Sequence, residues 1–346
     1  MRLNPLLLLS LTLTHTLAIA ACGPDRRSGG GGGGGVVPND GEGEGAAEGE
    51  GEDPGEGEGE GPAEGEGEGP AEGEGEGEGE GGRWIGPGYD CSDKIFPGAD
   101  ISDIRESYSP RDWREAALDT LDARFPDGAW VARSLDSPGD FDRWFDGSTG
   151  SWDRMVGSLD LGVHEGTHML GFQDMGFGTY TYNLGEGEVM QIQGIDTFFR
   201  REVYELLPQD VKDMLYADLY LRQIGDQDVK TLLDEFNAYT FSLYVSTALV
   251  DQFGTGSRSS ARDGILSFMF FVEVYFRIAR TEHPRDYEQM TSNDGFVELV
   301  LTLWDRAQCA LDLAGDDPRL GIDDVKVRPL VHDEEWLSEI RRFADL

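Results

Sequence analysis

Residues 23–82 place the tightest limit on what this chain can fold into, because they offer almost no apolar surface to bury. The stretch opens with a glycine run from Gly29 to Gly35 and continues as Gly-Glu repeats, with 19 acidic residues against 2 arginines. Such a chain cannot offset the entropy cost of folding, and repulsion between its carboxylates extends it. We expect residues 22–82 to form a disordered tether of roughly 40 Å or more, which confines the folded domain to residues 83–346.

The first residues have the features of an export signal. Arg2 gives a positive start, and a leucine-rich apolar run from Leu6 to Ala21 ends in small residues. This pattern predicts a signal peptide over residues 1–21 and not a membrane span. A later apolar stretch, residues 265–278, is too short to cross a bilayer.

The end of this signal, Ile19-Ala20-Ala21-Cys22, resembles the lipobox of bacterial lipoproteins. The resemblance implies that Cys22 carries lipid, becomes the mature N-terminus and holds the exported protein at a membrane. Gly23 is not the aspartate linked to inner-membrane retention in that family, so we expect an anchor in the outer membrane or at the cell surface. The alternative is an ordinary signal peptide with a nearby unmodified cysteine.

Charge and cysteine content limit the partners of the folded part. Residues 83–346 contain 49 acidic and 25 basic residues, a net charge of −24. This composition argues against a nucleic-acid partner, because binding nucleic acid requires basic patches on the protein. The negative charge also keeps the domain soluble. We expect the domain to be a monomer. If Cys22 is lipidated, Cys91 and Cys309 remain in an exported chain, and we expect a disulfide between them. The alternative is two separate buried thiols.

Helical periodicity dominates the folded part, and one segment alternates instead. Tyr180, Tyr182 and Leu184 alternate with polar residues, then a Gly-Glu-Gly turn and residues 189–192 follow, which predicts a β-hairpin. Its tyrosines either pack on the protein body or line a substrate groove. We therefore expect an α+β domain that is mainly helical with a minor sheet. Helices are predicted over 109–126, 140–145, 152–171, 197–207, 211–224, 230–253, 261–280, 295–313 and 334–346.

The residues from Leu161 to Leu170 read Leu-Gly-Val-His-Glu-Gly-Thr-His-Met-Leu. His164 and His168 are four apart, so on a helix they lie on one face, about one turn from each other. Two imidazoles so placed can reach one zinc ion, and Glu165 beside them can act as a general base. The chain has five histidines in all, so few chains of this composition would contain the pattern by chance.

This H-E-x-x-H pattern resembles the zincin metallopeptidases. The resemblance implies a zincin-like catalytic domain, a zinc cofactor, and hydrolysis of a peptide or protein substrate with Glu165 as the base. A catalytic zinc takes three protein ligands and leaves one position for water. A third ligand is therefore needed beyond His164 and His168.

One candidate for the third ligand is Asp174, which follows His168 by six residues. With Gly171 between them, the stretch is similar to the extended metzincin motif, in which a glycine turns the chain toward a third histidine or aspartate ligand. A metzincin also has a methionine turn soon afterwards. Met190 lies in a strand-like stretch and Met214 in a helical one, so this chain departs from the metzincin pattern there.

The other candidate is Glu235, within Leu-Asp-Glu-Phe-Asn-Ala-Tyr at 233–239. The stretch is similar to zincins, gluzincin-like, whose third ligand is a glutamate on a second helix in a Glu-x-x-Ala pattern. A carboxylate among apolar neighbours such as Phe236 is costly unless it meets a cation, and Ala238 lets two helices approach. We predict Glu235 as the ligand ahead of Asp174; the alternative is a surface Asp-Glu pair on an amphipathic helix.

Other side chains complete the set of candidates. Tyr239 lies one turn after Glu235, where its phenol either donates to a developing oxyanion or simply packs. Glu202 and Glu205 are the remaining choices for the third ligand. His283 stands among polar residues and is expected at the surface.

Together these features predict a lipid-anchored extracytoplasmic zinc metallopeptidase. Zinc would lower the pKa of its water and polarise the scissile carbonyl, while Glu165 moves the proton. Three alternatives stay open: a non-catalytic surface-binding lipoprotein on a degenerate zincin scaffold, a zinc amidase acting on cell-wall material, and a purely structural acidic lipoprotein without zinc.

Overall fold

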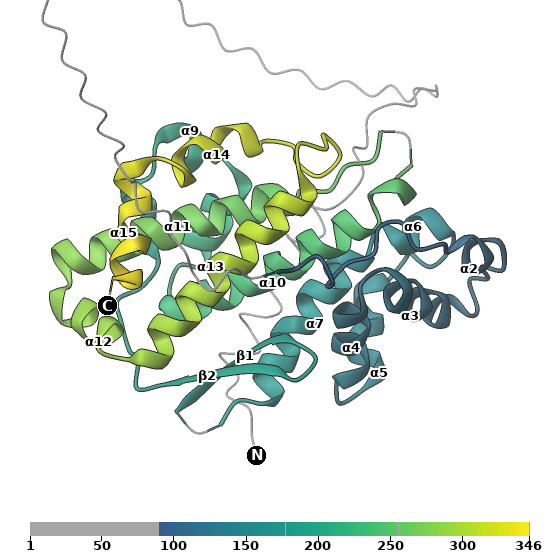
Figure 1. Ribbon diagram of the computed structural model, residues 1–346, viewed down its shortest axis with the longest axis horizontal. Coiled ribbons are helices and arrows are strands. Elements are labelled where there is room, and N and C mark those ends of the chain that lie inside the picture. The colour runs from purple at the N-terminus through teal and green to yellow at the C-terminus, as the bar shows by residue number, and fades with distance from the viewer. Residues whose placement is uncertain (1–89, 177, 255, 346) are drawn as a thin grey trace, which may run out of the picture. The chain divides into compact units, whose positions relative to one another are not determined.

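Helices make up most of the residues in the computed structural model, which describes 90–176, 178–254 and 256–345 (Figure 1). Four short turns of other helix types lie between them: the 3₁₀ turns η1 (Arg143–Phe145), η3 (Val250–Gln252) and η4 (Asp324–Lys326), and the π-helix η2 (Ala217–Gln223). The α-helices are α2 (Ser102–Glu106), α3 (Trp113–Arg124), α4 (Pro126–Ser134), α5 (Pro138–Asp142), α6 (Trp152–Val156), α7 (Leu159–Gln173), α8 (Arg201–Leu206), α9 (Gln209–Lys212), α10 (Val229–Ala248), α11 (Ala261–Glu282), α12 (Pro284–Thr291), α13 (Asp294–Ala314), α14 (Arg328–Val331) and α15 (Glu334–Ala344).

The sheet of the described part is a two-stranded antiparallel hairpin, β1 (Thr179–Gly185) and β2 (Glu188–Gln193). Tyr180 pairs with Ile192, and Tyr182 pairs with Met190. Gly187 closes the turn with a φ of 76°, which favours glycine. The hairpin and the mainly helical α+β class are thus confirmed.

Helix α10 is the centre of the core. It packs against α7, α11 and α13, and nearly all of its side chains are buried. Helix α11 is also buried along most of its length, as its apolar sequence predicts. Because α10 touches both α7 and the C-terminal helices, it can bring residues from distant parts of the chain to α7.

Several predicted helix boundaries were wrong for identifiable reasons. Pro126 does not end a helix but begins α4 at its first turn, where a missing N–H costs nothing. The predicted helix over 152–171 is interrupted at Gly157, which caps α6. The predicted helix over 211–224 is divided into α9 and the π-helix η2, and α12 was not predicted.

The predicted disulfide between Cys91 and Cys309 is confirmed, with the two Cα atoms 6.1 Å apart. It joins the start of the described part to α13 across a sequence separation of 218 residues. A cross-link over so long a loop stabilises the folded state mainly by restricting the unfolded chain.

The predicted signal peptide over 1–21, the lipidated Cys22 and the tether over 22–82 lie outside the described residues. Within the described ranges, every helix is too short or too polar to pass for a membrane-spanning segment.

Candidate metal centre

Helix α7 carries both motif histidines, and its glycines let it pack closely against its neighbours. A Cβ at Gly162 would lie 2.7 Å from the ring of Phe145, and one at Gly166 would lie 2.9 Å from the side chain of Val131. Both glycines lower intrinsic helix propensity, yet a larger residue at either position would push α7 away from η1 or α4. This close packing fixes the orientation of the helix face that bears His164.

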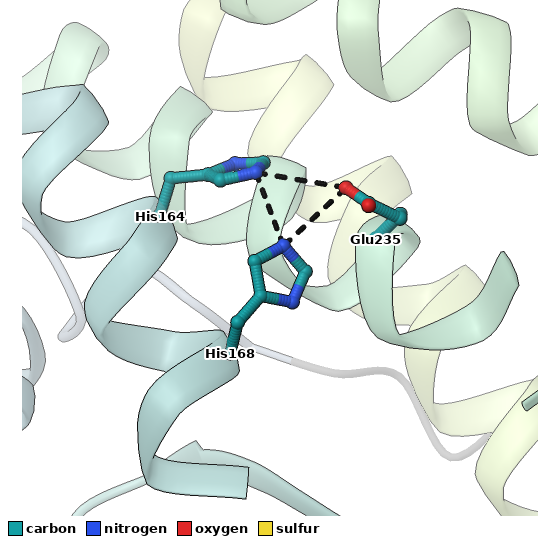
Figure 2. Close-up of side chains that lie close together, drawn as sticks. All are labelled: His164, His168 and Glu235. Carbon is teal, nitrogen blue, oxygen red and sulfur yellow. Dashed lines mark hydrogen bonds and ion pairs between the residues drawn. The ribbon is translucent and has the colours of Figure 1, made fainter. Parts of the chain in front are cut away.

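Three side chains from two helices meet in the protein interior (Figure 2). The Nε2 atoms of His164 and His168 on α7 lie 3.2 Å apart. Oε2 of Glu235 on α10 lies 3.6 Å from the first nitrogen and 3.3 Å from the second. All three residues are buried and form a group that could hold a metal ion. The structure therefore brings together the three residues predicted as metal ligands.

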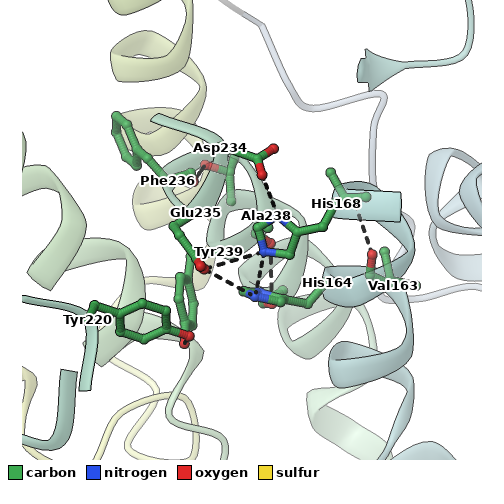
Figure 3. A network of polar contacts seen from close by, with 12 residues as sticks. Val163, His164, His168, Tyr220, Asp234, Glu235, Phe236, Ala238 and Tyr239 are labelled. Carbon is green, nitrogen blue, oxygen red and sulfur yellow. Dashed lines mark hydrogen bonds and ion pairs between the residues drawn. The ribbon is translucent and has the colours of Figure 1, made fainter. Parts of the chain in front are cut away.

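The second nitrogen of each imidazole is held by a neighbour on α10, which fixes the tautomer (Figure 3). Nδ1 of His168 lies 2.7 Å from Oδ2 of Asp234 and donates to this carboxylate. Nδ1 of His164 lies 3.1 Å from Oγ of Ser242. Because Ser242 donates its own proton to the carbonyl of Ala238, its oxygen accepts from His164. Both Nε2 atoms consequently face Glu235, where they can offer lone pairs to a metal ion, as metal-binding histidines do.

The electrostatics of this group favour a positive charge at its centre. Burial opposes the charged form of His168, but the carboxylates of Asp234 and Glu235 outweigh it and raise the pKa of His168 well above its ordinary value. Burial also raises the pKa of the Glu235 carboxyl, but His168 and His164 outweigh it and hold that pKa well below its ordinary range. Two lone pairs and a carboxylate oxygen in contact require a proton or a metal ion between them.

The spacing of the three atoms fits zinc. Zinc bonds of 2.0–2.1 Å in a tetrahedron place two ligand atoms about 3.3 Å apart. The three separations of 3.2, 3.3 and 3.6 Å agree with this value. Oε2 of Glu235 is buried and, among the described residues, makes no hydrogen bond that would compete with a metal.

The alternative third ligands lie elsewhere. Asp174 is exposed just after the end of α7, and its carboxylate lies 3.5 Å from the amide nitrogen of Asn183. Glu202 pairs with His283 at 2.9 Å, and Glu205 is exposed. None of the three belongs to the metal-binding group found in the described part. His283, expected at the surface, is half-buried and paired, because its ring stacks on Phe198 with centroids 4.3 Å apart.

The two predicted catalytic residues lie on the same helices as the ligand group. Glu165 follows His164 on α7 and is 5% exposed. The ring of Tyr239 lies edge-on to His164, with centroids 4.5 Å apart. Its hydroxyl lies 3.0 Å from the hydroxyl of Tyr220. Burial raises the pKa of Tyr239 well above its ordinary value, which keeps the phenol a donor.

The residues that hold the imidazoles were not predicted from the sequence. Asp234 is adjacent to Glu235, and a pair of neighbouring acidic residues on a helix more often lies at the surface. Ser242 lies seven residues after Glu235, two helical turns along the same face, and this spacing could have revealed it. Tyr180, predicted to pack or to line a groove, is buried and donates to Asp234 at 3.3 Å.

Removing the charge of Asp234 should weaken metal binding while the ligands stay in place. For Asp234→Asn we expect zinc affinity to fall about 10- to 100-fold, because the amide holds the imidazole of His168 less firmly and makes it less basic. Competition with a chromogenic chelator measures the affinity. Ser246→Ala, one turn beyond Ser242 and bonded to Asp160 instead, is the matched control. Equal zinc affinity in Asp234→Asn and wild type would show that the carboxylate does not support the site.

Comparison with known proteins adds no relative. No protein-family model, curated protein or solved structure matches the chain. Any assignment of function therefore depends on the chemistry of the ligand group and its neighbours.

Proposed function

We propose that this protein is a lipid-anchored, extracytoplasmic zinc metallopeptidase with a zincin-like catalytic domain. One observation carries the proposal: two Nε2 atoms and a buried carboxylate oxygen converge at separations of 3.2 to 3.6 Å. Glu165, whose carboxylate is buried, follows His164 on α7. In this proposal His164, His168 and Glu235 hold the zinc.

Each side chain then has a defined task in hydrolysis. A bound zinc supplies the Lewis acidity that makes a water acidic and polarises the scissile carbonyl. Glu165 accepts a proton from this water, and the hydroxide that is left adds to the carbonyl carbon. When the C–N bond breaks, Glu165 passes the proton to the leaving amine nitrogen, so it ends the cycle as a carboxylate. Asp234 and Ser242 keep both imidazoles oriented throughout.

The proposed location follows from the N-terminal sequence. The lipobox-like ending at Cys22 and the acidic repeat after it support an anchor with a long tether. Such a tether would let the domain act on peptides or proteins some distance from the membrane. The acidic composition of residues 83–346 disfavours nucleic acid as a substrate.

The full exported protein should contain about one zinc per chain and should cleave unstructured peptides. A strong chelator should abolish cleavage, and stoichiometric zinc should restore it, because the site has no other source of Lewis acidity. Elemental analysis and mass spectrometry of a peptide mixture measure both properties. A preparation without stoichiometric zinc would refute the proposal, and zinc without cleavage would point to a binding protein.

A further inference from the structure

A second tyrosine, on an unusual type of helix, contacts Tyr239. Tyr220 lies in the π-helix η2, and π-helical turns are rare and frequently found at functional sites. It is 2% exposed, and its hydroxyl lies 3.0 Å from the hydroxyl of Tyr239 (Figure 3). Tyr239 is the less buried of the pair.

The ring of Tyr239 is held in place by its neighbours. It lies edge-on to His164 and stacks on Phe268 of α11 at 5.1 Å. Gly264, one turn earlier on α11, leaves the space for the ring, because a Cβ there would lie 2.2 Å from Cδ1 of Tyr239. The position of the Tyr239 hydroxyl is therefore set by packing, and its hydrogen bond sets only the direction of its proton.

The number of protons on the two hydroxyls shows which tyrosine donates to the other. Two hydroxyls bring two protons, and the single hydrogen bond between Tyr220 and Tyr239 uses one of them. Neither hydroxyl makes another hydrogen bond within the described ranges. If Tyr239 donated, the second proton would remain on the deeply buried Tyr220 without an acceptor, which is unfavourable. Donation from Tyr220 leaves the free proton on Tyr239, the less buried residue.

A buried cation strengthens this arrangement. The guanidinium of Arg200 lies 5.7 Å from the centroid of the Tyr220 ring and is fully buried. Its Nε and Nη1 atoms have no hydrogen-bond partner among the described residues. A positive charge over a phenol ring makes the hydroxyl a better donor, and in a low-dielectric interior it also favours negative charge nearby.

We propose that Tyr220 is a positioning residue: it donates to Tyr239, so that the proton of Tyr239 points to the substrate carbonyl oxygen as this oxygen gains negative charge. Tyr239 is then a catalytic residue, and Arg200 supports the pair through its charge. The inference rests on the proposed hydrolase function and adds the source of oxyanion stabilisation.

Three single variants and one double variant of the full protein test the pair. Tyr239→Phe should lower kcat on the order of a hundredfold. Tyr220→Phe should lower kcat on the order of tenfold with little change in KM, since only the direction of one proton is lost. The double variant should be no slower than Tyr239→Phe alone. Tyr216→Phe is the control, because this ring also touches Tyr239 but its hydroxyl bonds Ser260.

A second readout does not depend on hydrolysis. In the cobalt-loaded protein, azide is a small anion that can take the open position on the metal, and its binding is followed in the visible spectrum. Tyr220→Phe should weaken azide binding about three- to tenfold, with metal content unchanged and Tyr216→Phe equal to wild type. Unchanged kcat and unchanged azide binding in Tyr220→Phe would overturn the inference and leave the peptidase proposal standing. Weaker azide binding in a protein that cleaves nothing would support the donation from Tyr220 to Tyr239 but would refute both the peptidase and the catalytic role of Tyr239, and a protein that takes up no metal would refute every part of the inference.

Discussion

Replacing Glu165 with glutamine should leave the zinc in place and lower peptide hydrolysis by about a hundredfold to ten-thousandfold. Glutamine has the same shape as glutamate but cannot accept a proton at neutral pH. Glu165 is not one of the three converging ligands, so its replacement should not empty the site. It is buried next to His164 on α7, and we expect its carboxylate to accept the proton of a water beside the ligand group.

The measurement is kcat/KM on one defined peptide, together with zinc content, for wild type and Glu165→Gln. Glu186→Gln is a matched control, since it removes the same charge from an exposed position in the hairpin turn. We expect the control to cleave at the wild-type rate. If Glu165→Gln cleaves as fast as wild type, the general-base mechanism and with it the hydrolase proposal must be abandoned.

The fold class could be predicted from the sequence because its longest elements are marked clearly. Helices α10, α11 and α13 are long runs rich in apolar residues, and the hairpin at 179–193 alternates between glycine-containing turns. The errors lie where a local signal has two meanings. Pro126 can end one helix or begin the next, and only packing decides between them. The zincin-like arrangement itself stays a prediction, since no solved structure matches the chain.

Some residues of the candidate site could likewise be predicted from the sequence, and others could not. The H-E-x-x-H spacing requires only one helix, so His164 and His168 could be placed from sequence alone. Glu235 required the additional argument that a carboxylate among apolar residues needs a cation. Tyr220 could not be found, because its contact with Tyr239 depends on a π-helix whose register differs from the helix that the sequence predicts.

Glu235→Gln should remove most of the bound zinc, while Asp174→Asn should retain it. A neutral amide is a poor ligand for zinc, and Glu235 supplies one of three protein ligands. We expect zinc affinity to fall by more than about a hundredfold, beyond the effect of a residue that only orients a ligand. Asp174 is exposed after the end of α7 and hydrogen-bonded to Asn183, so its replacement should not reach the metal.

These two variants decide between the two geometries that the sequence allows, because each removes one carboxylate and keeps the size of the side chain. Zinc content by elemental analysis is the measurement, with His164→Ala as a variant that should also lose the metal. A site emptied by Asp174→Asn and retained in Glu235→Gln would mean that the chain turns at Gly171 to form a metzincin-like centre. In that case the close approach of Oε2 of Glu235 to both Nε2 atoms, at 3.6 and 3.3 Å, would be a salt bridge of the metal-free protein. If His164→Ala and Glu235→Gln lose the zinc and Asp174→Asn keeps it, α7 and α10 must share the ion. The contact between these two helices is then part of the active site.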